Sequence, residues 1–457
     1  RWRNFLCWKP TPGEFEPALP TGDPVERDSL ESTQPESQKV FAPAARLRGR
    51  FMMKFPAHWM LALFASVALM VSNGMTLSGL SVYDLAFIDE FGWSMGAIKF
   101  RDMITLVLTG LSAPFAGILI DRYGVRRCML AGWVVLSAGY LCYSRMTTLL
   151  QMYAIHAGFA LVLVSCGLNA AVILVSSWFL RLRGTAIGIA LVGTSLGGAL
   201  FPQYGTAMIE ALGWRAAFSW ASLIPAAMFV ITLVWVRDHP SERGLPVLGE
   251  DEQQKAGQAS LAAGGMGFSD ALRTRTFWAF ALFAMATFYT VLGAQSHLYK
   301  YMRDAGFDAQ MATNAISLFF LSALAGKFVF GILSDIVDCM KVLYANVAVM
   351  LAGAILLARM DTGQVWLAVG AFGLGWGGAY TLLQLSVINA FGIRDAGKIL
   401  GTITVLHAIG GGLGIWLTGL IYDATGSYDL PFIIFCGLIV FALLCLTMIR
   451  PWLKEDR

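Results

Sequence analysis

The sequence predicts an all-α membrane protein in which twelve transmembrane helices form two pseudo-symmetric six-helix bundles. Three observations lead to this prediction: an apolar composition, twelve stretches without charge, and an internal repeat. Of the 457 residues, 57% are hydrophobic and 14% are charged, whereas soluble domains carry about 25% charged residues. This composition excludes a large soluble enzyme and a disordered protein. The net charge of +4 is too small for a nucleic-acid-binding surface.

Twelve stretches of the chain contain no Asp, Glu, Lys or Arg. They cover 55–83, 103–120, 128–144, 146–180, 184–209, 216–236, 276–299, 309–326, 342–358, 362–393, 399–422 and 430–449. Each is long enough, or nearly so, to cross a hydrocarbon core of about 30 Å as a helix of about 20 residues. Strands would need a closed barrel with alternating polar and apolar residues, and the sequence does not show that alternation.

The two halves of the chain repeat each other at an offset of 213–214 residues. Gly117, Asp121 and Arg127 correspond to Gly331, Asp335 and Lys341, and Gly184 and Gly197 correspond to Gly397 and Gly410. Two parallel repeats of six helices predict a binding site near the midplane between them. Rocking of the halves would expose that site to either side of the membrane in turn.

The domain organisation follows from these stretches. We expect a disordered cytoplasmic tail over 1–54, a six-helix bundle over 55–236, a cytoplasmic linker over 237–275, a second bundle over 276–450 and a cytoplasmic tail over 451–457. Lys and Arg are more numerous in the short segments on the side of the two termini, which predicts that both termini are cytoplasmic. The first 51 residues are predicted to be either an upstream translation or a dispensable extension, and Ser269 is predicted to cap a short helix over 271–276.

A loop between the second and third predicted helices carries a family signature. Its sequence, Gly117-Ile-Leu-Ile-Asp121-Arg122-Tyr-Gly124-Val-Arg126-Arg127, resembles the corresponding loop of the major facilitator superfamily. The resemblance covers about residues 55–450 and implies the major facilitator fold. It also implies a conformational latch between the halves, formed by Gly117, Asp121, Arg122, Gly124, Arg126, Arg127, Gly331 and Asp335.

Three further motifs resemble one branch of that family, the bacterial monocarboxylate porters and oxalate/formate exchangers. They are Phe91-Gly-Trp-Ser94, Phe277–Trp278 and Asp423-Ala-Thr-Gly-Ser-Tyr428. The branch implies a multi-pass protein of the plasma (bacterial inner) membrane. Because these residues are mostly turn, cap and interface residues, they indicate the branch and leave the substrate open.

Lys327 is the strongest candidate for a substrate contact. It interrupts the eighth predicted helix after eighteen uncharged residues, and a lysine near mid-helix costs about 2.5–3.5 kcal/mol on insertion scales. In the resembled branch this helix carries a cation in an Arg-x-x-x-Gly frame that binds the substrate carboxylate. Lys327-Phe-Val-Phe-Gly331 fits that frame with Lys in place of Arg, and an ammonium lacks the bidentate fork of a guanidinium. Alternatively, Lys327 reaches along its helix towards Asp335.

Other polar residues in the predicted helices are weaker candidates for substrate binding. His407 either pairs with a second carboxylate, relays a proton or simply packs among glycines. Arg101, next to Asp102, either collects anions at the mouth of the site or forms a structural ion pair. Tyr289, Asn314, Tyr380, Gln384 and Asn73 are candidate hydrogen-bonding residues for a small polar solute.

The coupling mechanism stays open at the level of sequence. Proton-linked members of the resembled family carry an Asp one turn before the helix 8 cation, whereas this chain has Ala323. The partners expected are a lipid bilayer, a small anionic substrate and either a coupled proton or a counter-anion. We expect no nucleic acid, no cofactor and no metal, and a functional monomer.

Together these features predict a secondary active or facilitative transporter of small organic anions, mono- or dicarboxylates, that works by alternating access. The alternative is an exporter of drug-like or other small amphipathic solutes on the same fold. An enzyme is not expected, since the five His are scattered and no HExxH is present. Gly193-Thr-Ser195-Leu-Gly197 matches the letters of a GxSxG nucleophile elbow, but it lies inside a predicted membrane helix rather than in a strand-to-helix turn.

Overall fold

The computed structural model describes residues 57–248, 265–359, 362–392 and 394–449. These residues belong to one compact unit, Phe55–Arg457. The predicted tails over 1–54 and 451–457 lie outside the described residues.

Helices make up almost all of the described chain. The first half contains α1 (Ala57–Thr76), η1 (Ser78–Tyr83), α2 (Asp84–Phe91), α3 (Met95–Tyr123), α4 (Val125–Tyr143), α5 (Leu149–Cys166), α6 (Leu168–Trp178), α7 (Arg183–Leu212), α8 (Trp214–Ala221) and α9 (Leu223–Trp235). The second half contains α11 (Phe268–Leu272), α12 (Arg275–Asp304), α13 (Ala309–Ile336), α14 (Cys339–Ala358), α15 (Val365–Phe391), α16 (Ala396–Thr425) and α17 (Asp429–Thr447). A short 3-10 helix, η2 (Pro240–Arg243), follows α9.

Eleven segments of the described chain are long and apolar enough to cross a membrane. The twelfth is α3, which passes the same test as a pair of helices bent by 66° between Ala113 and Gly117. Several neighbouring helices join into one span, as α1, η1 and α2 do over Ala57–Phe91. The predicted all-α fold with twelve spans is therefore confirmed.

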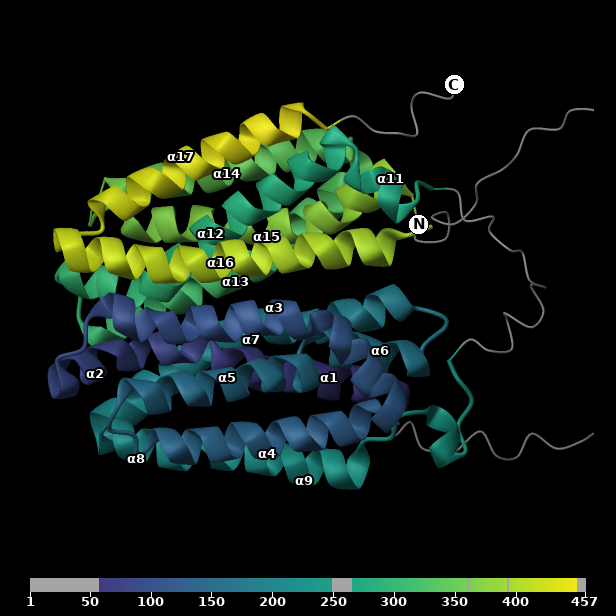
Figure 1. Ribbon diagram of the computed structural model, residues 1–457, viewed down its shortest axis with the longest axis horizontal. Coiled ribbons are helices and arrows are strands. Elements are labelled where there is room, and N and C mark those ends of the chain that lie inside the picture. Colours follow the sequence, from purple (N-terminus) through teal and green to yellow (C-terminus); the bar gives the residue numbers. More distant parts are fainter. Residues whose placement is uncertain (1–56, 249–264, 360–361, 393, 450–457) are drawn as a thin grey trace, which may run out of the picture. The chain divides into compact units, whose positions relative to one another are not determined.

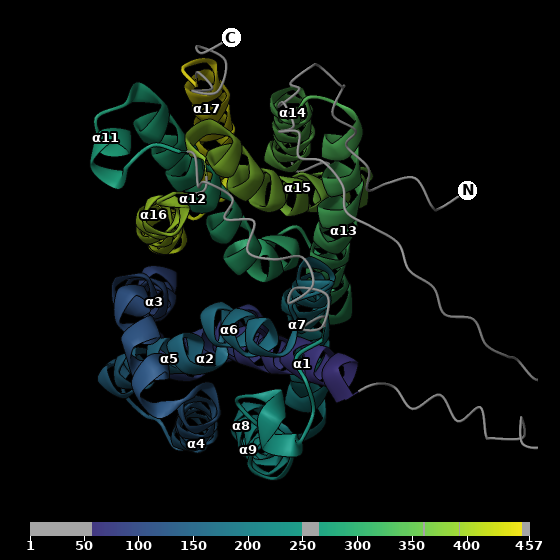
Figure 2. The ribbon, with the colours of Figure 1, turned by 90° about the vertical axis from the view of Figure 1, so that its right-hand side faces the viewer.

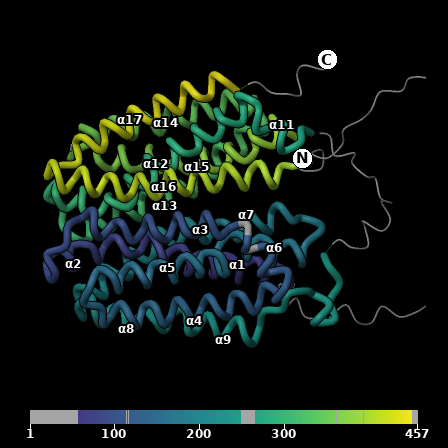
Figure 3. Tube along the Cα trace, viewed as in Figure 1, coloured from purple at the N-terminus to yellow at the C-terminus, as the bar shows by residue number. Residues whose placement is uncertain are grey.

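The internal repeat is visible in the helix boundaries. Helices α3 and α13 begin at Met95 and Ala309, 214 residues apart, and α4 and α14 begin with the same separation. Helices α7 and α16 correspond at both ends with a separation of 213 residues. The Cα trace shows α3, α4 and α7 in one half and α13, α14 and α16 in the other (Figure 3).

Glycines allow the helices of each half to pack closely. In the first half, a Cβ on Gly193 of α7 would lie 1.9 Å from the backbone oxygen of Ser66 on α1. In the second half, a Cβ on Gly414 of α16 would likewise lie 2.1 Å from the backbone oxygen of Tyr289 on α12. A larger residue at either position would push the two helices apart, which is why small residues are favoured at helix contacts in membranes.

The two halves meet along two helix pairs, α3 with α16 and α7 with α13. Figure 1 shows the two sets of helices, and Figure 2 shows both pairs at the seam. We call the end of the bundle at which α1 begins the proximal end, and the end at which α3 begins the distal end. Helices α7 and α16 begin at the proximal end and α13 begins at the distal end, because successive spans alternate in direction.

The segment before α12 differs from its prediction. Ser269 does not cap a helix over 271–276, since it lies inside α11, whose N-cap is Gly267. Thr274 has an extended backbone instead, and its side chain accepts the N–H of Phe277 and caps α12. Helix α11 is joined to α16 by the N–H of Phe268, which donates to Asp395 at 2.9 Å and lowers the pKa of that carboxyl group.

The loop between α3 and α4 is built around Gly124 and Asp238. Gly124 has φ +83° and ψ 152°, a conformation that is essentially restricted to glycine. Asp238, just after α9, accepts the N–H of Arg126 at 2.7 Å, and its other carboxylate oxygen lies 2.4 Å from where a Cβ of residue 124 would be. The Arg126 side chain donates to the backbone oxygen of Leu233 at 2.6 Å. The signature loop is thus held to α9 in its own half.

Gly124→Ala should lower the melting temperature of the purified protein more than Gly213→Ala does. Gly213 has nearly the same backbone angles (φ +78°, ψ 159°) but has no atom within 4 Å of its Cβ position, so that Gly213→Ala costs only the backbone strain. Gly124→Ala adds displacement of Asp238 and loss of its hydrogen bond, about 1 kcal/mol more. Equal shifts in thermal unfolding for the two variants would contradict the role given to Asp238.

Candidate functional site

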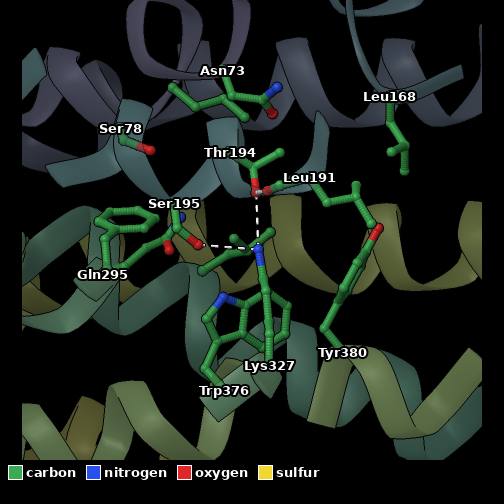
Figure 4. A pocket seen from close by; sticks show the side chains of 13 residues that line it. Asn73, Ser78, Leu168, Leu191, Thr194, Ser195, Gln295, Lys327, Trp376 and Tyr380 are labelled. Atoms are coloured by element: carbon green, nitrogen blue, oxygen red, sulfur yellow. Dashed lines mark hydrogen bonds between the residues drawn. The ribbon is translucent and has the colours of Figure 1, made fainter. Parts of the chain in front are cut away.

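A cavity of about 170 Å³ lies at the seam between the two halves. Figure 4 shows the side chains that line it. The first half contributes Asn73, Leu77, Ser78, Leu168, Leu191, Thr194 and Ser195, and the second half contributes Leu292, Gln295, Phe320, Lys327, Trp376 and Tyr380. Because the lining is shared almost equally, a substance bound there would contact both halves.

The amine of Lys327 points into this cavity from α13. It donates hydrogen bonds across the seam to the hydroxyl groups of Thr194 (2.9 Å) and Ser195 (3.0 Å) on α7 (Figure 4). The alternative contact with Asp335 is not formed, since Asp335 lies exposed near the end of α13. Among the described residues, no carboxylate forms an ion pair with Lys327. The cavity therefore contains a cation whose protein partners are neutral.

Aromatic side chains form the wall of the cavity next to Lys327. Trp376 and Tyr380 lie one turn apart on α15, with their ring centroids 5.8 Å from each other. Phe288 of α12 packs edge-on against Trp376, with a centroid distance of 4.8 Å. The cavity thus combines one charged group with an apolar wall, the composition typical of a small-molecule site.

A second cavity, of about 200 Å³, adjoins the first and contains His407. Both cavities are lined by Asn73, Leu77, Leu168 and Leu292. The His407 ring is stacked on Phe288, with centroids 3.8 Å apart and an angle of 11° between the planes. His407 is therefore a neighbour of the Lys327 cavity rather than part of its lining.

A third cavity continues this series towards the proximal end. It shares Ala113, Asn169 and Thr404 with the second cavity and is also lined by Gly397 and Gly401 near the start of α16. The Cβ positions of both glycines have no atom within 4 Å, so that their surfaces face open space. The three cavities, which share lining residues, follow one another from the proximal end to Lys327.

The distal end of the seam is closed by contacts between the halves. Gln203 of α7 donates to Asn314 and Ser317 of α13, both at 2.9 Å. Asp423 of α16 accepts the N–H groups of Met95 and Gly96 at 2.8 and 2.7 Å. It thereby caps the first turn of α3 from the opposite half, where a negative charge also interacts favourably with the helix dipole.

A buried cluster of charges lies next to this closure. Asp84 pairs with Lys99 and with Arg101, both at 2.6 Å. Asp102 lies 3.4 Å from Arg101 and 3.9 Å from Lys99. The side chains of Lys99 and Arg101 are completely buried, and Lys99 also donates to the backbone oxygen of Ser296 in the other half at 2.5 Å.

The structure brings only some of the predicted binding residues together. Asn73 and Tyr380 line the cavity with Lys327, and His407 lines the adjoining one. Four predicted residues, Arg101, Tyr289, Asn314 and Gln384, line neither cavity.

Each of these four residues has another environment. Arg101 is in the buried cluster, where its charge is balanced by Asp84, and this placement favours the structural ion pair that the sequence left open. Tyr289 packs on Phe435 of α17. Asn314 belongs to the distal closure and Gln384 is exposed.

The predicted latch residues stay a prediction. Gly124 and Arg126 contact Asp238 in their own half. The other polar members, Asp121, Arg122, Arg127 and Asp335, are exposed. Gly117 and Gly331 have no atom within 4 Å of their Cβ positions. This arrangement agrees with a seam that is open at the proximal end.

Four residues important to the seam were not among the candidates from sequence. Thr194 and Ser195 contact Lys327, Gln295 lines the same cavity, and Asp84 pairs with both cations of the buried cluster. An amide in the middle of an apolar helix is a usable signal for Gln295. The hydroxyl residues carry no such signal, because Ser and Thr are common at helix contacts in membranes.

Comparisons with known proteins agree with this architecture. Residues 60–414 and 298–456 match the Major Facilitator Superfamily. The chain is 26% identical over 394 residues to monocarboxylate transporter 6 of Homo sapiens, covering 80% of this chain and 75% of that protein. It is 24% identical over 393 residues to the oxalate:formate antiporter of Oxalobacter formigenes, covering 81% and 89%. A crystal structure of a bacterial homologue of the human lysosomal transporter Spinster, inward-facing and occupied, has a similar fold (TM-score 0.64, 15% identity, 86% of this chain and 97% of that one).

Asp84→Asn should destabilise the protein strongly, since it leaves Lys99 and Arg101 buried with Asp102 alone as a nearby acid. Removing one partner of a buried ion pair costs about 3–5 kcal/mol. The matched control is Glu90→Gln, which breaks the Glu90–Arg215 pair, both of whose side chains are about 40% exposed; a surface pair contributes below about 1 kcal/mol. Thermal unfolding in detergent measures the stability of both variants. A small loss of stability for Asp84→Asn would show that the buried cluster does not depend on Asp84 for its charge balance.

Proposed function

The chain belongs to the Major Facilitator Superfamily, and we propose that it transports small organic anions, mono- or dicarboxylates, by alternating access. Transport is either secondary active or facilitative, and the solute crosses the membrane without chemical change, so that no catalytic residue is assigned. Lys327 is the main contact of the substrate carboxylate in this proposal. Asn73 and Tyr380 supply further hydrogen bonds.

The observation that carries the proposal is the electrostatic state of Lys327. Its ammonium group has two neutral hydroxyl partners and no carboxylate partner among the described residues. A partly buried charge without an opposite charge is less favourable than one that is paired. A carboxylate entering the cavity supplies that opposite charge and forms a charge-assisted hydrogen bond, which is stronger than a neutral one.

The space around Lys327 is large enough for a small acid. The cavity that Lys327 lines measures about 170 Å³, and it adjoins the second cavity of about 200 Å³. The relatives named monocarboxylate transporter 6 and oxalate:formate antiporter support the same substrate class. Export of amphipathic solutes is the competing function, and it would be indicated by binding of such compounds without competition from acids.

The direction of opening follows if both termini are cytoplasmic. The proximal end then faces the cytoplasm, and the structure represents a state that is closed outside and open inside. The distal hydrogen bonds between α7 and α13 and between α3 and α16 would break when the halves rock into the opposite state. A lipid bilayer and the anionic substrate are the partners in this cycle.

Lys327→Ala should abolish carboxylate uptake into liposomes, while the protein still folds and inserts. Lys327→Arg should retain part of the uptake, because a guanidinium keeps the charge and offers two parallel donors on one planar group. Lys341→Ala is the control, since Lys341 is exposed near the start of α14. Unchanged uptake by Lys327→Ala would remove the site assignment.

A thermal-shift screen of mono- and dicarboxylates should identify acids that stabilise the wild-type protein. A ligand that binds only the folded state raises the melting temperature, by an amount equivalent to about 2.7 kcal/mol at one hundred times its dissociation constant. Lys327→Ala should lose this shift. A screen in which amphipathic amines stabilise the protein and no acid does would contradict the carboxylate proposal.

A further inference from the structure

Ser195 is the second polar group that faces the amine of Lys327 and also lines the cavity. Its residue is buried, with 2% of its surface exposed. Its hydroxyl oxygen lies 3.0 Å from Lys327 Nζ, on a helix of the opposite half (Figure 4). The neighbouring hydroxyl groups of Thr194 and Ser195 differ in whether their protons already have a hydrogen-bond acceptor.

The hydroxyl of Thr194 already donates one hydrogen bond and accepts another. It donates to the backbone oxygen of Leu191, three residues earlier, at 2.8 Å, and it accepts a hydrogen bond from Lys327. Such a bond to the preceding turn is the usual arrangement for Ser and Thr inside a helix. Thr194 therefore acts towards Lys327 only as an acceptor.

The hydroxyl of Ser195 accepts a hydrogen bond but donates none among the described residues. Its oxygen accepts from Lys327, and none of the hydrogen bonds among the described residues gives its proton an acceptor. A serine hydroxyl carries one donor and two acceptor lone pairs, so its O–H is available to a molecule in the cavity. Lys327 likewise has three N–H donors, of which two meet Thr194 and Ser195.

The two atoms that carry these free donors lie 3.0 Å apart. One is the third N–H of Lys327, and the other is the O–H of Ser195. A carboxylate has two oxygens and readily accepts two hydrogen bonds at once. A lysine alone offers a point charge, whereas an arginine offers two parallel donors on one planar group.

We propose that Ser195 is a direct substrate contact that donates its O–H to one carboxylate oxygen while Lys327 donates to the other. This inference rests on the proposed carboxylate transport. The serine supplies the second donor that is lost when the helix carries Lys instead of Arg. Because the two donors belong to α7 and α13, the bound carboxylate connects both halves.

The test compares dissociation constants in two backgrounds. The probe is whichever of pyruvate, oxalate and benzoate raises the melting temperature of the full-length wild-type protein most. Binding is measured by isothermal titration calorimetry for wild type, Ser195→Ala, Lys327→Arg and the double variant. Ser386→Ala, a buried serine on α15 that contacts Cys339, is the matched control and should leave the dissociation constant unchanged.

Ser195→Ala should raise the dissociation constant about tenfold or more in the Lys327 background, since hydrogen bonds to charged groups are strong. The same substitution should raise the dissociation constant less than about threefold in the Lys327→Arg background, because the guanidinium supplies both donors itself. Ser195→Cys, which keeps a weak donor, should give an intermediate value and serves as the second variant if Ser195→Ala does not fold.

Two results would overturn the inference while leaving carboxylate transport in place. An unchanged dissociation constant for Ser195→Ala would show that the hydroxyl does not touch the substrate. An equal loss of affinity in the Lys327 and Lys327→Arg backgrounds would show that the serine hydroxyl does not replace the donor that an arginine would provide. Failure of all three acids to bind the wild-type protein would overturn the proposed function and this inference with it.

Discussion

The structure depends on one ammonium group that reaches from one half of the protein to hydroxyls of the other. Lys327 belongs to α13, and its two partners belong to α7. Hydroxyl groups solvate a positive charge without neutralising it, so that a net charge stays at the seam. A carboxylate bound there would both complete the electrostatics and contact the two halves. Substrate binding and the rocking of the halves therefore both involve the contacts of Lys327 with Thr194 and Ser195.

The fully buried charges show by contrast why Lys327 is unusual. Lys99 and Arg101 are completely buried, but Asp84 lies 2.6 Å from each, and Asp102 supplies the second negative charge. That cluster is balanced within the protein and stands beside the distal closure, where Asp423 caps α3 across the seam. Charges that are already paired hold the helices in place, whereas an unpaired charge in a cavity attracts a solute.

Much of the fold, but less of the site, could be predicted from the sequence. Charged residues end each apolar stretch, and the repeat fixes corresponding helix starts, as at Met95 and Ala309. Lys327 stands out because a charge in an apolar helix is costly. Its partner Ser195 is 132 residues away, a contact that no local pattern encodes. Asp84 was missed because each stretch was ended at its first charge, although the span continues to Phe91.

The most direct test of Lys327 as the anion site is an experimental structure determined with a bromine-substituted carboxylate, such as bromoacetate. The anomalous signal of bromine locates the acid independently of any assumption about its orientation. The account predicts the signal in the cavity between Lys327, Trp376 and Tyr380, with the carboxylate within hydrogen-bonding distance of the lysine amine. A signal elsewhere, or a lysine amine turned into the lipid or paired with a protein carboxylate, would contradict it.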